Sequence, residues 1–142
     1  MKFLKFISRI LHRKRNGVQF FEKNPEVENP DTKTVVVPVG IKSKVDLIQL
    51  FIDKWDFPDY SNTNWDSFYA NLTDLEWIKE ANVRIIHLDV PLSEGKDRDV
   101  YFKILKNIMT YWFNDQSHHL EISFPLASKK ELEKRGLLEG MD

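Results

Sequence analysis

The sequence contains no cysteine and only five glycines in 142 residues. Without cysteine the chain has no disulfide, no thiolate zinc site and no cysteine nucleophile, which fits a reducing compartment. None of the glycines belongs to a phosphate-cradling loop motif. No apolar run approaches the roughly 20 residues that a membrane-spanning helix needs. Yet 42% of the residues are hydrophobic and 13% are aromatic, which is enough for the core of one domain and excludes a wholly disordered chain.

The residue patterns that most enzymes use are also missing. No His-x-x-x-His pair exists among the four histidines, which are His12, His87, His118 and His119. His87 falls inside an apolar strand and is expected to be a satisfied core or edge residue rather than a base, whereas His118 and His119 precede a strand and are expected to be solvated. Asp59 and Asp66 lie among polar residues and lack the burial that a catalytic carboxylate pair needs. The sequence therefore predicts no catalytic residue, no metal site, no cofactor and no enzymatic activity.

The charge is unevenly distributed, although the formal net charge is only -1. Residues 1–15 carry six bases and no acid, so the remaining 127 residues hold 15 bases and 22 acids. Eight of those acids, against two bases, lie between residues 46 and 80. An acidic surface of this kind repels nucleic acid and attracts basic proteins.

Residues 2–15, here called the basic arm, have the spacing of an amphipathic helix. Its apolar residues are Phe3, Leu4, Phe6, Ile7, Ile10 and Leu11. Lys5 and Arg9 interrupt the apolar stretch, so the arm does not resemble a secretory signal. Two interpretations stay open, a helix packed on its own domain and an interfacial membrane anchor. Because the following segment is polar and contains two prolines, we expect a helix and linker at 1–33, a domain at 34–127, and a C-terminal helix and tail at 128–142.

Strand and helix patterns alternate along the rest of the chain. Short β-branched or alternating runs predict strands at 35–39, 83–90 and 119–124. Helical spacing predicts helices at 44–55, 64–72, 98–113 and 128–136, and a short helix at 74–80. Ser43 and Thr63 are each followed three residues later by aspartate, the spacing of helix caps. Since strands separated by helices need crossovers, the sequence predicts an α/β fold with a small three-stranded parallel sheet covered by helices, plus the extra N-terminal helix.

The stretch from residue 55 to residue 77 is rich in aromatic and acidic residues. In a helix over 64–72, Trp65, Phe68, Tyr69 and Leu72 share one stripe, with Phe68 and Leu72 toward the core. Asp66 and Ala70 are four residues apart and share the neighbouring face. An ordinary solvated helix face is one interpretation of these residues. The interpretation that we favour is a protein-binding surface, because aromatic anchors beside acids are typical of interface hot spots.

This stretch resembles the barstar family of ribonuclease inhibitors. The matching residues are Phe57-Pro58-Asp59-Tyr60, Asn64-Trp65-Asp66, Phe68, Leu72-Thr73-Asp74-Leu75 and Trp77. The order of predicted elements fits as well over residues 34–127. The resemblance implies a three-stranded parallel sheet, and a loop and acidic helix that plug the active site of a small basic ribonuclease.

The resemblance also implies a set of partner-binding residues. These are Tyr60, Asn62, Asn64, Trp65, Asp66, Tyr69, Ala70, Thr73 and Asp74. Tyr69 replaces a tryptophan, and Ala70 stands where such inhibitors usually carry the aspartate that enters the phosphate pocket. Three explanations of Ala70 stay open: a different target, a neighbouring acid that takes over the role, or a fold that has lost nuclease inhibition.

Two functional hypotheses follow. The first is a cytoplasmic inhibitor, of immunity or antitoxin type, that binds a small basic ribonuclease or nuclease toxin in a one-to-one complex and does not bind nucleic acid directly. The second is a membrane-associated adaptor, in which the basic arm contacts anionic lipid peripherally and the domain keeps the fold without nuclease inhibition. An anchored inhibitor would satisfy both hypotheses.

Overall fold

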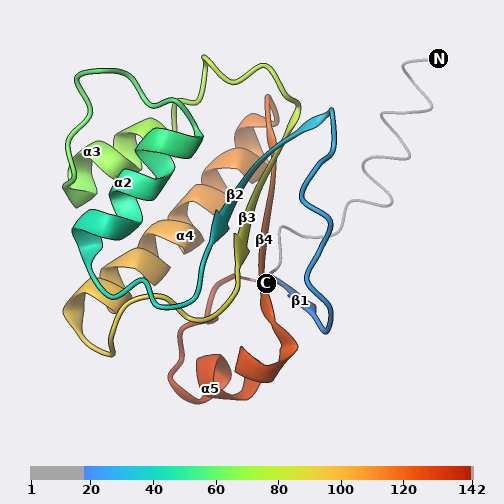
Figure 1. Cartoon of the computed structure of the whole chain (residues 1–142), viewed down its shortest axis with the longest axis vertical. Coiled ribbons are helices and arrows are strands. Elements are labelled where there is room, and N and C mark those ends of the chain that lie inside the picture. Colours follow the sequence, from blue (N-terminus) through green and yellow to red (C-terminus); the bar gives the residue numbers. More distant parts are fainter. Residues whose placement is uncertain (1–17, 142) are drawn as a thin grey trace.

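The computed structural model describes residues 18–141 and contains a sheet of four parallel strands (Figure 1). The strands are β1 (Gln19–Phe21), β2 (Thr32–Val37), β3 (Asn82–His87) and β4 (His119–Pro125), in the order β1-β4-β3-β2. The α/β class and the parallel sheet are confirmed, but the predicted number of three strands is wrong. The additional strand β1 is only three residues long and pairs with β4 at the edge of the sheet. The helix predicted over the basic arm lies outside the described residues.

Within residues 18–141, four α-helices and one short 3-10 helix accompany the strands. They are α2 (Lys44–Lys54), α3 (Trp65–Leu72), α4 (Lys96–Asp115), η1 (Leu126–Ser128) and α5 (Lys129–Lys134). Ser43 caps α2 as predicted, because its side-chain oxygen accepts a hydrogen bond from Asp46 N at 3.1 Å. The predicted cap at Thr63 is wrong: α3 begins one residue later, and its cap is Asn64, whose Oδ1 accepts a hydrogen bond from Ser67 N at 2.8 Å.

The short helix predicted at 74–80 is absent from the structure. Leu75 has a φ of 49°, in the left-handed region, and the chain there forms turns, with Leu75 N donating to Asn71 O at 3.2 Å. The first predicted strand is also shifted: β2 ends at Val37, because Pro38 has no N–H with which to extend the ladder.

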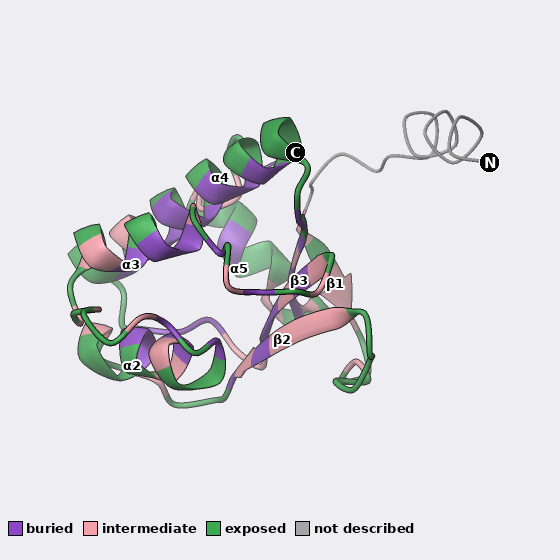
Figure 2. Cartoon of the chain, turned by 90° about the horizontal axis from the view of Figure 1, so that it is seen from above, coloured by how far each residue is buried: buried purple, intermediate pink, exposed green. Residues whose placement is uncertain are grey.

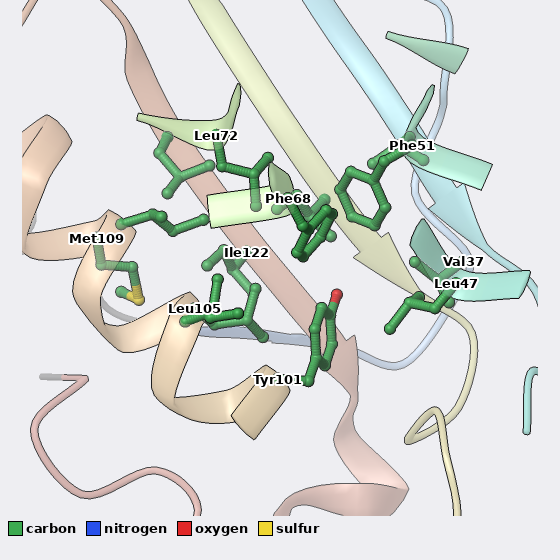
Figure 3. Packing of buried hydrophobic residues seen from close by; sticks show 14 of the residues in the cluster. Val37, Leu47, Phe51, Phe68, Leu72, Tyr101, Leu105, Met109 and Ile122 are labelled. Atoms are coloured by element: carbon green, nitrogen blue, oxygen red, sulfur yellow. The ribbon is translucent and has the colours of Figure 1, made fainter. Parts of the chain in front are cut away.

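Helices α2, α3 and α4 lie on one side of the sheet and turn their buried faces inward (Figures 1 and 2). One row of buried strand residues faces these helices: Val35, Ile85 and Ile122. Phe68 of α3 lies at the centre of the core, with its ring 4.9 Å from that of Phe51 in α2 and 6.3 Å from that of Tyr101 in α4 (Figure 3). These contacts fix α3 against both neighbouring helices, which matters because α3 carries most of the candidate site.

His87, the last residue of β3, is fully buried, so of the two predicted places, core or edge, it occupies the core. Its Nδ1 lies 3.0 Å from Ser123 O, which can only accept, so Nδ1 donates and Nε2 accepts the hydroxyl proton of Tyr101 at 2.7 Å. Its ring also stacks on Phe124 at 4.1 Å. Burial lowers the pKa of His87 to about 4, partly offset by the bond to Ser123 O, and burial raises the pKa of Tyr101. The ring is therefore neutral in the folded protein at neutral pH.

We expect the free energy of unfolding to increase as the pH rises from about 4 to 6.5. Over this range His87, whose ordinary pKa is 6.5, is protonated in the unfolded chain but not in the folded chain. Unfolding therefore takes up as much as about one proton, and acid favours the unfolded state. Urea unfolding at a series of pH values measures this slope. His87→Gln should remove that component, whereas His119→Gln, at an exposed position, should keep it. An equal slope in wild type and His87→Gln would contradict this assignment.

Candidate functional site

Hydrogen bonds hold the loop between α2 and α3 in one conformation. Ser61 N donates to Pro58 O at 2.9 Å, which closes a turn. Asn71 of α3 donates from Nδ2 to Ser61 Oγ at 2.8 Å, and Asn62 N donates to Ser67 Oγ at 3.1 Å. The loop is therefore fastened to α3 at two points, and little order would have to be gained on binding a partner.

The tip of this loop projects away from the domain. Phe57, just before it, is buried, with its ring 5.8 Å from that of Trp77. Asp59 is exposed, and Tyr60 is 76% exposed, the largest value among the exposed large hydrophobic residues of the described chain. Tyrosine is enriched at protein interfaces, so Tyr60 at the loop tip offers an aromatic side chain to a partner.

Helix α3 separates a buried face from an exposed one. Phe68 and Leu72 are buried as predicted, with at most 1% of each exposed. Asp66 and Ala70 are exposed, and Tyr69 is 37% exposed. Because positions three and four apart are neighbours on a helix, these last three side chains form one continuous outer surface beside the loop.

Trp65 is less open than the neighbouring candidate residues. Its Nε1 donates to Asp97 Oδ1 at 3.2 Å, and its ring stacks on that of Tyr101 at 6.3 Å. Both partners belong to α4. The structure thus places Trp65 as the link that fixes the first turn of α3 to α4, with only part of its ring at the surface.

Two further candidate residues follow the outer face to the end of α3. The hydroxyl of Thr73 lies 3.0 Å from Tyr69 O and 3.2 Å from Ala70 O and donates back into the last turn. Asp74 comes next and is exposed. The structure therefore brings Asp66, Tyr69, Ala70, Thr73 and Asp74 together along α3 and the two residues that follow it.

A buried histidine fastens the turn after α3, which corrects the expectation that His118 is solvated. His118 is 8% exposed, with Nδ1 2.8 Å from Glu80 O and Nε2 3.0 Å from Leu75 O. Trp112 of α4 donates from Nε1 to Leu72 O at 2.8 Å. The hydrogen bonds of His118 and Trp112 join residues about forty positions apart, so no pattern near His118 could reveal its burial. His119 is exposed as expected.

The acids on this surface are not neutralised by the described part of the chain. Four of them are exposed and form no ion pair with any residue of 18–141: Asp59, Asp66, Asp74 and Glu76. Acids elsewhere do pair, for example Asp56 with Lys33 at 3.5 Å and Glu121 with Arg84 at 3.6 Å. The loop and α3 therefore present uncompensated negative charge beside exposed tyrosines.

Asp115 adds a carboxylate at the end of α4. It lies three residues after Trp112, whose indole reaches the end of α3. Ser117 donates to its Oδ1 from the backbone N at 3.1 Å and from the hydroxyl, and these bonds lower the pKa of Asp115. The carboxylate is exposed and ionised at neutral pH.

Sequence reasoning missed the residues that hold the site together. Ser61, Ser67 and Asn71 form the hydrogen bonds that fix the loop, and Asp97 anchors Trp65. A signal for one of them existed: Asn71 is a polar residue on the buried side of an amphipathic helix, and buried amides are nearly always hydrogen-bonded. Nothing in the sequence connects Trp65 to a residue 32 positions later.

The described part of the chain offers no grouping for other chemistry. Among residues 18–141, no three or more His, Asp or Glu side chains gather in a way that could hold a metal ion. None of the helices in that range combines the length and apolarity needed to cross a bilayer.

The fold and the site thus define a small parallel α/β protein that presents a rigid acidic and aromatic surface. The model of the family described as Barstar (barnase inhibitor) matches residues 34–125, more than half of the chain. The chain therefore belongs to the barstar family, which confirms the resemblance seen in the sequence. Members of this family are inhibitors rather than enzymes. No curated protein and no solved structure matches the chain.

Proposed function

We propose that this protein is an inhibitor, of immunity or antitoxin type, that binds a small basic ribonuclease or nuclease toxin in the cytoplasm as a one-to-one complex. The contact surface is the loop tip and the outer face of α3. It comprises Tyr60, Asn62, Asn64, Trp65, Asp66, Tyr69, Ala70, Thr73 and Asp74. Membership of a family of ribonuclease inhibitors supports the proposal.

The observation that carries it is the juxtaposition of unpaired acids with exposed tyrosines on a fixed frame. Asp59 and Asp66 are exposed without an ion-pair partner among the described residues, and Tyr60 and Tyr69 lie beside them. A ribonuclease active site is built to hold phosphate, so carboxylates can occupy it in place of substrate. Aromatic anchors then supply buried area at low entropic cost.

Ala70 determines how such a surface would bind. It lies on the outer face of α3, four residues from both Asp66 and Asp74. In this proposal Asp66 and Asp74 make the charged contacts, and Ala70 packs against the rim of the active site without a charge. The target is then a basic nuclease whose active site accommodates the methyl group of Ala70.

We expect the chain to inhibit RNA cleavage by a small basic ribonuclease. The first test titrates barnase with the full-length protein, and the second recovers proteins from a lysate of the source cells on tagged full-length protein and assays them for RNA cleavage. A basic ribonuclease that is retained at low salt, inhibited one to one, and released as salt rises would support the proposal. If barnase is not inhibited and a lysate with ribonuclease activity yields no bound ribonuclease, the proposal is wrong.

A further inference from the structure

An apolar groove lies at the opposite end of the molecule from α3, beside β1 and α5 (Figure 1). Its volume is about 510 Å³, within the range of clefts that hold ligands or side chains. Val18 and Phe20 form one wall, and because they alternate along the strand they face the same side. Leu138 and Met141 form the other wall. Both ends of the described chain therefore meet at this groove.

At the groove the apolar core is only partly covered. Phe20 pairs in register with the fully buried Phe124, yet Phe20 itself is only half-buried, as are Val18 and Leu138. Strand β1 is also the edge of the sheet, and no strand among residues 18–141 pairs with its outer side. An apolar wall beside an open strand edge is a surface that soluble proteins normally cover.

The rim of the groove carries one carboxylate without an ion-pair partner among the described residues. Glu133 and Glu139 line it and are exposed. Lys129 lies 3.9 Å from Glu133 and 5.4 Å from the centre of the Phe20 ring, so Lys129 and Glu133 offset each other. Glu139 forms no ion pair with any residue in 18–141. The groove therefore suits a segment that is apolar on one side and basic on the other.

We propose that the basic arm, residues 2–15 of the same chain, fills this groove with its apolar stripe. The arm carries six bases, no acid and a helical stripe of apolar residues, which complements both the walls and the rim. Only Asn16 and Gly17 separate it from Val18, and Asn-Gly favours a tight turn that reverses the chain. Docking there leaves α3 free, so the arm stabilises the domain without competing for the partner-binding surface.

The chain has no cysteine, so a single introduced one gives a unique labelling site. Full-length ¹⁵N-labelled Ser8→Cys carries a nitroxide on the arm, away from its apolar stripe, and the reduced label is the reference. We expect the amide signals of Gly136, Leu138 and Met141 to lose most of their intensity. Broadening on α3 instead, at Asp66 and Tyr69, or no broadening in the described domain, would overturn the proposal.

Variants on the arm separate docking from misfolding, because they leave the described domain intact. Ile7→Glu should reduce the broadening to that of a freely tethered arm and lower the melting temperature by a few degrees, whereas the matched Ile7→Leu should keep both at the level of the parent chain. Broadening that stays at the parent level in Ile7→Glu contradicts an apolar contact. Broadening of a ¹⁵N chain by a separate labelled ¹⁴N chain would show docking onto a second copy. Absence of broadening together with sedimentation on phosphatidylserine vesicles would assign the arm to the membrane; either outcome overturns the proposal.

Discussion

Asp66→Arg is expected to weaken binding of a basic ribonuclease about 1000-fold, which corresponds to about 4 kcal/mol. The substitution removes a carboxylate that meets the cationic active site, and it places a like charge there. Asp66 is exposed and makes no ion pair with any other described residue, and replacing this acid in the first turn of α3 should lower the stability of the domain by only about 0.3–1 kcal/mol. Titration calorimetry against barnase or the captured ribonuclease measures the loss, and thermal unfolding checks that the fold is retained.

Glu28→Arg provides a matched control for this substitution. It produces the same change in net charge. Glu28 is exposed in the segment between β1 and β2, which runs on the side of the strands away from α3 (Figure 1). It should slow association slightly through the weaker overall field and leave the dissociation rate unchanged. If both variants lost affinity equally, the effect would be one of net charge, and the proposed surface on α3 would be wrong.

The main elements of the fold could be predicted because their signals are local. The β-branched run at Val35 to Val37 and the long apolar stripe of α4 identify a strand and a helix without knowledge of the rest of the chain. Strand β1 has no such signal: three residues gain strand geometry only by pairing with β4, about a hundred positions later. The predicted helix at 74–80 fails for a related reason. Its apolar residues serve distant contacts, as when Trp77 Nε1 donates to Trp55 O at 2.8 Å.

The outer face of α3 could be located from sequence, but its rigidity could not. Helical spacing alone places Asp66 and Ala70 apart from the buried Phe68, but it groups Tyr69 with Phe68 on one stripe, and the structure instead leaves Tyr69 37% exposed beside Asp66 and Ala70. The contacts that fix this face come from far along the chain, and no periodicity encodes them. Asp97 holding Trp65 is one such contact. Partner-binding roles rest on the family resemblance, because exposure and charge by themselves do not distinguish a binding surface from a solvated one.

Ala70→Asp is expected to strengthen binding to barnase about 10- to 150-fold. A carboxylate at this position can accept charge-assisted hydrogen bonds in a phosphate pocket, each worth about 1.5–3 kcal/mol. Ala70 lies on the exposed face of α3, so the longer side chain meets no core residue. The new carboxylate stands four residues after Asp66, and this repulsion should lower the stability of the domain by only about 0.2–0.5 kcal/mol.

Ala70→Asn separates charge from shape, because asparagine has almost the same size as aspartate without its charge. If the gain depends on the carboxylate, Ala70→Asn should stay close to wild type, and the gain of Ala70→Asp should shrink as salt rises. Equal gains in both variants would mean that added contact area, rather than charge, had been missing. If neither variant binds barnase more tightly than wild type, position 70 does not face the active site, and α3 meets its partner in an orientation different from the one proposed.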